Sequence, residues 1–110
     1  MGVLIREEIA KLLLRKVRDP RVNRVTITEV DVSPDLRMAR VFYSVMGPEE
    51  ERSRAAQGLK SAGGFIKREL ASRLNLKFMP EMVFMLDTSL EKLERMERVF
   101  RELEQERRHD

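Results

Sequence analysis

Two groups of basic side chains are the residues in this 110-residue sequence whose types and spacing could do chemistry, and that chemistry is phosphate binding. The first basic cluster is Arg15, Lys16, Arg18, Arg21 and Arg24, and the second basic cluster is Lys60, Lys67, Arg68, Arg73 and Lys77. Each cluster encloses a single opposing carboxylate. Either cluster alone is typical of a solvated surface, since basic residues also favour the end of a helix. Two of them on one small domain favour a nucleic-acid interface.

Gly63 and Gly64 lie inside the second basic cluster, in a segment, residues 53–74, whose apolar residues keep helical spacing. Each glycine in a helix costs about 1 kcal/mol relative to alanine, so the pair predicts a break in the helix. A break would let the backbone approach a ligand closely and would leave unpaired N–H groups beside basic side chains, an arrangement suited to phosphate. The alternative is a plain turn between two packed helices.

The distribution of charge favours a polyanionic partner. The chain has 22 basic and 19 acidic residues, for a net charge of +3, and residues 1–77 hold 16 of the basic residues against 10 acidic ones. There are six aromatic residues, and we expect Phe42, Tyr43, Phe78 and Phe84 to lie in the core because they fall in or beside expected strands. Few aromatic side chains would then be left on the surface for bases to stack on. Recognition should therefore depend on phosphates and RNA shape, and affinity should fall strongly with salt.

The residue types argue against an enzyme. The chain has no cysteine, and its one histidine, His109, lies in a polar tail, so no disulfide, zinc site, redox site or cofactor is expected. Asp31 fits a strand, Asp35 a turn and Asp87 the start of a helix, and no phosphate-gripping motif accompanies them. There is no signal-peptide pattern and no apolar run of about 20 residues, so a cytoplasmic protein without membrane contact is expected.

The first half of the chain predicts a helix and two strands. Residues 3–17 form an amphipathic helix that Asp19-Pro20 ends. Residues 25–33 alternate as a strand, but the apolar set changes parity, which predicts a bulge near Thr28 and Glu29. After a turn, residues 38–46 are apolar on both faces, as expected of a central strand buried on both sides.

The second half predicts the broken helix, a third strand over residues 81–87 and a last helix. A helical crossover between the second and third strands makes them parallel, whereas the first two strands form an antiparallel hairpin. The last helix begins at a capping box, Thr88 to Glu91, and has Leu93, Met96, Phe100 and Leu103 on one stripe. We expect it to pack on its own domain, residues 1–104, and to fray after about Glu104. Residues 105–110 would then be a disordered polar tail.

The order helix, strand, strand, kinked helix pair, strand, helix is that of a type II KH-like domain, and the chain resembles the bacterial ribosome-binding factor A family. The motifs that carry this resemblance are Arg18 to Arg21, Val32 to Leu36, Ala39 to Val45, Ser61 to Lys67, Pro80-Glu81 and Asp87 to Glu91. Ala62, Gly63 and Gly64 match the family's Ala-x-Gly interhelical kink, which replaces the G-x-x-G loop of KH domains. The resemblance implies an α+β fold, a three-stranded mixed sheet with helices packed on one face.

The resemblance also implies a function. The family is a non-catalytic assembly factor that binds immature small ribosomal subunits and assists maturation of small-subunit rRNA, with particular importance in the cold. Both basic clusters and the kink would then contact rRNA. The expected partners are the small ribosomal subunit and its precursor rRNA, the expected state is a monomer, and a link to a maturation GTPase is left open. The alternative is a protein-interaction module that docks through its last helix, with the basic clusters serving solubility.

Overall fold

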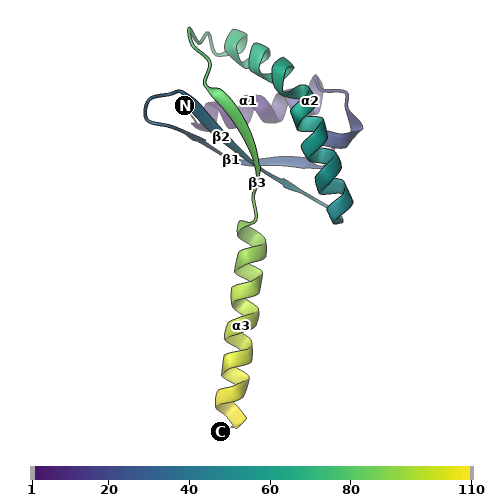
Figure 1. Cartoon of the computed structure of the whole chain (residues 1–110), viewed down its shortest axis with the longest axis vertical. Helices are drawn as coiled ribbons and strands as arrows, with labels where there is room; N and C mark the ends of the chain where they lie inside the picture. The colour runs from purple at the N-terminus through teal and green to yellow at the C-terminus, as the bar shows by residue number, and fades with distance from the viewer. Residues whose placement is uncertain (1, 110) are drawn as a thin grey trace.

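The computed structural model describes residues 2–109, in which a three-stranded sheet is covered on one face by two helices while a third helix projects away (Figure 1). The elements in chain order are α1 Gly2–Arg15, the short 3-10 helix η1 Pro20–Val22, β1 Val25–Val32, β2 Met38–Val45, α2 Glu49–Arg73, β3 Glu81–Leu86 and α3 Ser89–His109.

The first helix forms because its apolar residues return every three or four positions. Ile5, Ile9 and Leu12 are fully buried on that stripe. The helix ends at Arg15, two residues before the expected Val17, and the chain turns into η1 at Asp19. The Asp19 carboxylate accepts a hydrogen bond of 3.0 Å from the Arg21 backbone N–H, which caps the short helix.

The sheet has the predicted topology, with strand order β1-β2-β3. β1 and β2 are antiparallel and β2 and β3 are parallel, as expected. The pairing of β1 shifts between Ile27 and Glu29, which confirms the bulge. Because the bulge inserts one residue, Ile27 and Val30 both face the core even though their separation is odd.

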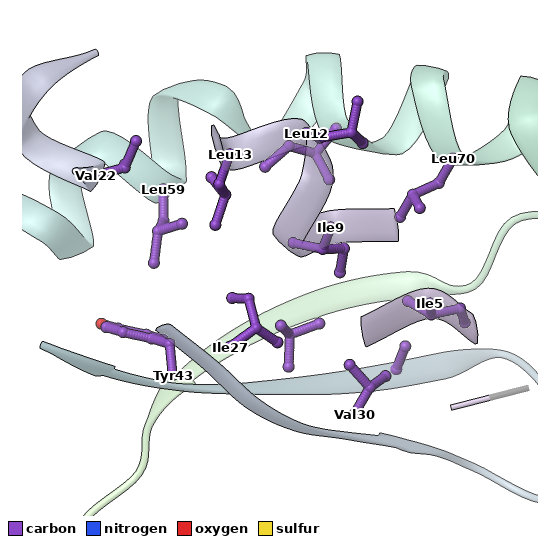
Figure 2. Close-up of a cluster of buried hydrophobic side chains, with 13 residues drawn as sticks. Ile5, Ile9, Leu12, Leu13, Val22, Ile27, Val30, Tyr43, Leu59 and Leu70 are labelled. Atoms are coloured by element: carbon purple, nitrogen blue, oxygen red, sulfur yellow. The ribbon is translucent and has the colours of Figure 1, made fainter. Parts of the chain in front are cut away.

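The core lies between the inner face of the sheet and the stripes of α1 and α2. Figure 2 shows side chains of Ile9, Leu12 and Leu59 pointing from the helices toward Ile27 and Tyr43 on the strands. This packing fixes the positions of α1 and α2 relative to each other, and therefore of the basic residues on their outer surfaces.

The expectation that β2 is buried on both faces is wrong. Ala39, Val41 and Tyr43 are buried on the inner face, but Met38 and Arg40 are exposed on the other face. Both packed helices lie on one side of the sheet, so the second side has no covering layer (Figure 1). β2 is nevertheless the central strand, as predicted.

The expected break at Gly63 and Gly64 is also wrong. α2 is one continuous helix of 25 residues, although its ribbon changes direction near its middle (Figure 1). Among the described residues only Gly47 is a glycine with positive φ. Leu59, Ile66 and Leu70, on both sides of the glycine pair, are fully buried. Their burial on one continuous face stabilises the helix by more than the roughly 2 kcal/mol that two glycines cost.

The last helix does not pack on the domain, contrary to expectation. Leu90, Leu93, Met96, Val99, Phe100 and Leu103 are between 49% and 69% exposed. The helix also continues past Glu104, the expected point of fraying, to His109. It leaves the sheet directly after β3 and extends away from it (Figure 1), and its apolar stripe stays exposed along the described part of the helix. No helix among the described residues combines the length and apolarity that crossing a membrane would take.

Candidate nucleic-acid interface

The end of α1 and the turn after it lie against the middle of α2. A shallow depression is lined by Lys16, Arg18 and Asp19 on one side and by Ser61 and Phe65 on the other. The two halves of the predicted site, the first basic cluster and the middle of α2, are therefore neighbours in space. We call this region, extended to Arg68 one turn along α2, the α1–α2 surface.

Gly58 is what allows this close approach, and the sequence pattern did not single it out. A Cβ atom at this position would lie 2.9 Å from Cγ1 of Val22 and 3.0 Å from Cβ of Arg21. The first distance is shorter than real Cβ contacts and the second is at the tight limit, so any larger residue at position 58 would displace η1. The spacing of four residues between Gly58 and Ala62, which places both on one face of the helix, was the one sequence signal that could have pointed to it.

Arg21 is committed to the fold. Its guanidinium donates to both carboxylate oxygens of Asp19, with Nη2 to Oδ2 at 2.6 Å, and Nη2 also lies 3.4 Å from the Ser61 hydroxyl. The Arg21 side chain is the main reason that the pKa of Asp19 is lowered, and the same pairing raises the pKa of Arg21. Arg21 therefore positions the turn that carries Arg18, and it is less available for phosphate than its neighbours.

The second basic cluster does not form one patch. Lys60 lines a groove between α2 and β3 together with Gly63 and Phe84. On the same side, Nζ of Lys67 lies 3.8 Å from Glu81.

The other members of the cluster point elsewhere. Arg73 contacts Glu8 at 3.4 Å and Glu69 at 3.5 Å. Lys77 lies over the ring of Phe78, with Nζ 5.7 Å from its centroid. Arg24, from the first cluster, lies beside Gly47 in the turn between β2 and α2.

Seven of the ten predicted contact residues are exposed and have no carboxylate within ion-pair distance among the side chains described for residues 2–108. They are Arg15, Lys16, Arg18, Arg24, Lys60, Arg68 and Lys77. The remaining three, Arg21, Lys67 and Arg73, are paired with carboxylates. The unpaired cations are the ones that a phosphate can contact without breaking an existing ion pair.

The glycine pair contributes bare surface and not free N–H groups. Since α2 is continuous, its backbone N–H groups at Gly63 and Gly64 are those of a helix interior, and the hypothesis that they bind phosphate is wrong. A Cβ atom at Gly63 would meet nothing within 4 Å, and one at Gly64 would meet only Nη1 of Arg68 at 3.6 Å. The helix surface between Lys60 and Arg68 is thus open to close approach by a ligand.

The three aspartates considered for catalysis have structural partners. Asp31 pairs with Arg40 at 2.5 Å across the strands. Asp35 accepts hydrogen bonds from the Ser33 hydroxyl and the Arg37 N–H in the hairpin turn. Asp87 accepts from the Ser89 N–H at the start of α3. Within the described part of the chain, no three His, Asp or Glu side chains are grouped as metal ligands.

The fold and this basic surface define a KH-like α+β domain. The sequence model of the ribosome-binding factor A family matches residues 1–100, and the chain belongs to that family. It is 51% identical over 104 residues to ribosome-binding factor A of Dictyoglomus thermophilum, across 94% of this chain and 87% of that protein.

Solved structures share the fold. The crystal structure of ribosome-binding factor A from Thermus thermophilus matches with a TM-score of 0.67 at 22% identity, over 77% of this chain and 90% of that one. A homology model of the Thermus thermophilus factor, fitted into the cryo-EM map of a complex with the 30S subunit, matches with a TM-score of 0.64 at 23% identity, over 79% and 91%.

Proposed function

We propose that this protein is a non-enzymatic assembly factor that binds immature small ribosomal subunits through rRNA phosphates and assists maturation of the small-subunit rRNA. The observation that carries the proposal is the set of exposed cations without carboxylate partners, five of which lie at the end of α1 and the middle of α2. Membership in the family supports it, as does the 30S complex of the Thermus thermophilus relative.

The geometry favours recognition of the RNA backbone. Arg15, Lys16 and Arg18 follow each other at the end of α1, where they can contact successive phosphates, and Arg68 can contact a phosphate from across the depression. The bare helix surface at Gly63 and Gly64 would let the RNA lie close to α2. Such contacts fix the position of a particle on the protein without reading its sequence, and we infer that the protein acts as a monomer on precursor particles.

The test is a change of charge. Replacing Arg15, Lys16 and Arg18 together with glutamate should weaken binding to purified small subunits. It should also lower the slope of log affinity against log salt, by somewhat less than one unit for each phosphate that the variant no longer neutralises. The matched control replaces Lys92, Arg95 and Arg98 on α3, which is the same change of charge away from the interface. An unchanged slope in the first variant would contradict the proposal.

The competing function is a protein-interaction module, and the exposed apolar stripe of α3 is the observation that favours it. The two functions predict opposite effects of two sets of substitutions on small-subunit binding. If Leu93→Glu with Phe100→Glu abolishes subunit binding while the charge reversal on α1 leaves it intact, the interaction is with protein through α3. We expect the reverse, because Arg15, Lys16 and Arg18 are exposed and have no carboxylate partner among the described side chains.

A further inference from the structure

Phe78 lies almost entirely in solvent, although its sequence position predicted a place in the core. Its side chain is 81% exposed, in the loop between α2 and β3. The loop is held at both ends, because the Leu76 N–H bonds the Ala71 carbonyl at 3.2 Å and the Glu81 N–H bonds the Arg37 carbonyl at 2.8 Å. These bonds hold the two ends of the loop, which lies at the end of the molecule away from α3 (Figure 1).

A cavity of about 580 Å³ lies beside the ring. The hairpin turn between β1 and β2 supplies one wall through Leu36 and Arg37, and the α2–β3 loop supplies the other through Phe78, Met79 and Pro80. This volume is in the range of roughly 300–1,000 Å³ that is usual for small-molecule sites. The cavity is large enough for one nucleotide and is lined mainly by apolar side chains.

The backbone conformation and exposure of Leu36 indicate that this end of the domain is not optimised for stability. Its φ of 61° is in the left-handed region, which a bulky side chain rarely adopts, and the side chain is still 52% exposed. Asparagine or glycine would suit this turn position better. Strained backbone and exposed apolar surface at one place indicate a binding function.

The charges at the rim suit a nucleotide. Lys77 lies 5.7 Å from the Phe78 ring centroid, and Arg37 has no carboxylate within ion-pair distance among the described side chains. Two carboxylates also line the cavity: Glu81 is paired with Lys67 at 3.8 Å, whereas Asp35 accepts hydrogen bonds from the neutral Ser33 hydroxyl and Arg37 N–H and keeps its negative charge, so the phosphates must lie on the side of Lys77 and Arg37. An exposed ring with two available cations beside it is the arrangement on which an unpaired base stacks while its phosphates are held.

We propose that Phe78 and this cavity receive an unpaired RNA nucleotide, whose base stacks on the ring and whose phosphates contact Lys77 and Arg37. The proposal rests on the proposed function and adds to it a site for single-stranded RNA. Lys67 lies on α2 beyond Lys60 and contacts Glu81, which lines this cavity, so one RNA strand can follow α2 from its middle to the cavity. Stacking would give the protein a preference for unpaired over duplex RNA, which phosphate contacts alone do not give.

The experiment uses the full chain and a short single-stranded oligoribonucleotide that carries 2-aminopurine, a base whose fluorescence is quenched by stacking. Phe78→Leu keeps an apolar side chain but removes the ring, and should weaken binding about tenfold and abolish the quenching. Phe78→Tyr keeps a ring and should bind within about twofold of the parent. Phe100→Leu, at a similarly exposed phenylalanine on α3, is the matched control and should have no effect. Melting curves of all variants check that the fold is retained.

Several results would overturn this inference. One is equal binding and quenching by the parent and Phe78→Leu, and another is failure of the parent to bind the single-stranded probe. Loss of small-subunit binding in Phe78→Leu without any change in oligonucleotide binding would assign the cavity to a protein side chain. Failure here is distinct from failure of the proposed function, which is decided by the charge reversal at Arg15, Lys16 and Arg18 on small subunits.

Discussion

Asp87 joins the domain to its last helix through hydrogen bonds that reach back to the bulge in β1. Its carboxylate accepts from the Thr28 hydroxyl at 2.7 Å and from the Ser89 N–H at 2.9 Å. Thr28 lies within the shifted pairing of β1, so the bulge both keeps Ile27 and Val30 in the core and aims this hydroxyl at the start of α3.

These bonds make stability depend on acid pH. Hydrogen bonds from the Ser89 and Thr28 side chains lower the pKa of Asp87 from 3.8 to about 2. Because the unfolded chain takes up this proton first, the stabilisation is present above pH about 4 and is lost as pH falls toward 2. We expect Asp87→Asn to flatten the dependence of melting temperature on pH in this window. The pKa values of Asp19 and Asp35 are also lowered, so the melting temperature of the variant should still depend on pH to some extent. Identical slopes in parent and variant would contradict this assignment.

Replacing both Gly63 and Gly64 with alanine should stabilise the domain by up to about 2 kcal/mol. Both positions are helical and have room for a methyl group, and alanine is the better helix former. The same methyl groups cover the bare surface between Lys60 and Arg68, and we expect binding to small subunits to fall at least about tenfold, about 1.4 kcal/mol. A melting curve and a binding titration on the same variant measure both. If the variant binds small subunits as tightly as the parent and is more stable, the two glycines are not part of the interface.

The residue types of the site could be predicted from the sequence, but their partners could not. The clustering of Arg15, Lys16 and Arg18 is local, and the structure leaves all three exposed. The partner of Arg73, Glu8, is 65 residues away along the chain, so spacing gives no sign of the pair. Gly58 was missed for the same reason, since its constraint comes from η1 and not from its own helix.

Among the elements, the three strands and the bulge were predicted because their signals are local. Alternation and parity are properties of a few adjacent residues, and β1, β2 and β3 end within one residue of their expected bounds. The three errors concern tertiary contacts, and the first is that the second face of β2 is not covered. Packing holds α2 together across its glycines, and an amphipathic pattern in α3 shows that a helix has an apolar stripe without showing what covers it.

Deleting residues 105–110 should leave the melting temperature and small-subunit binding nearly unchanged, because this tail has no apolar side chain to bury. Deleting all of α3, from Ser89 onward, should also leave the melting temperature of the domain within a few degrees, because no α3 residue belongs to the core. Differential scanning calorimetry of both truncations checks this. A loss of many degrees in the longer deletion would show that the stripe of α3 packs on the domain.

At the scale of the whole molecule, α3 makes the protein elongated. The structure measures 64 × 33 × 17 Å and has a Cα radius of gyration of 17.8 Å, whereas a compact chain of this length would have about 13 Å. Small-angle scattering at low protein concentration should therefore give a value near that of the structure. A value near that of a compact domain would mean that α3 folds back onto the open face of the sheet.

The side-chain bonds described between α3 and the domain are at the start of the helix, where Arg52 pairs with Glu91 and Asp87, just before α3, bonds Thr28, so the two parts do not share one cooperative unit. Most helical stability in proteins comes from tertiary packing, and the apolar stripe of α3 is exposed, so amide protons along α3 should exchange at rates set by fraying, while those of β2 exchange only on global opening. A helix signal followed during heating would begin to fall before the core melts. The free energy of unfolding obtained from that signal would then describe neither part alone.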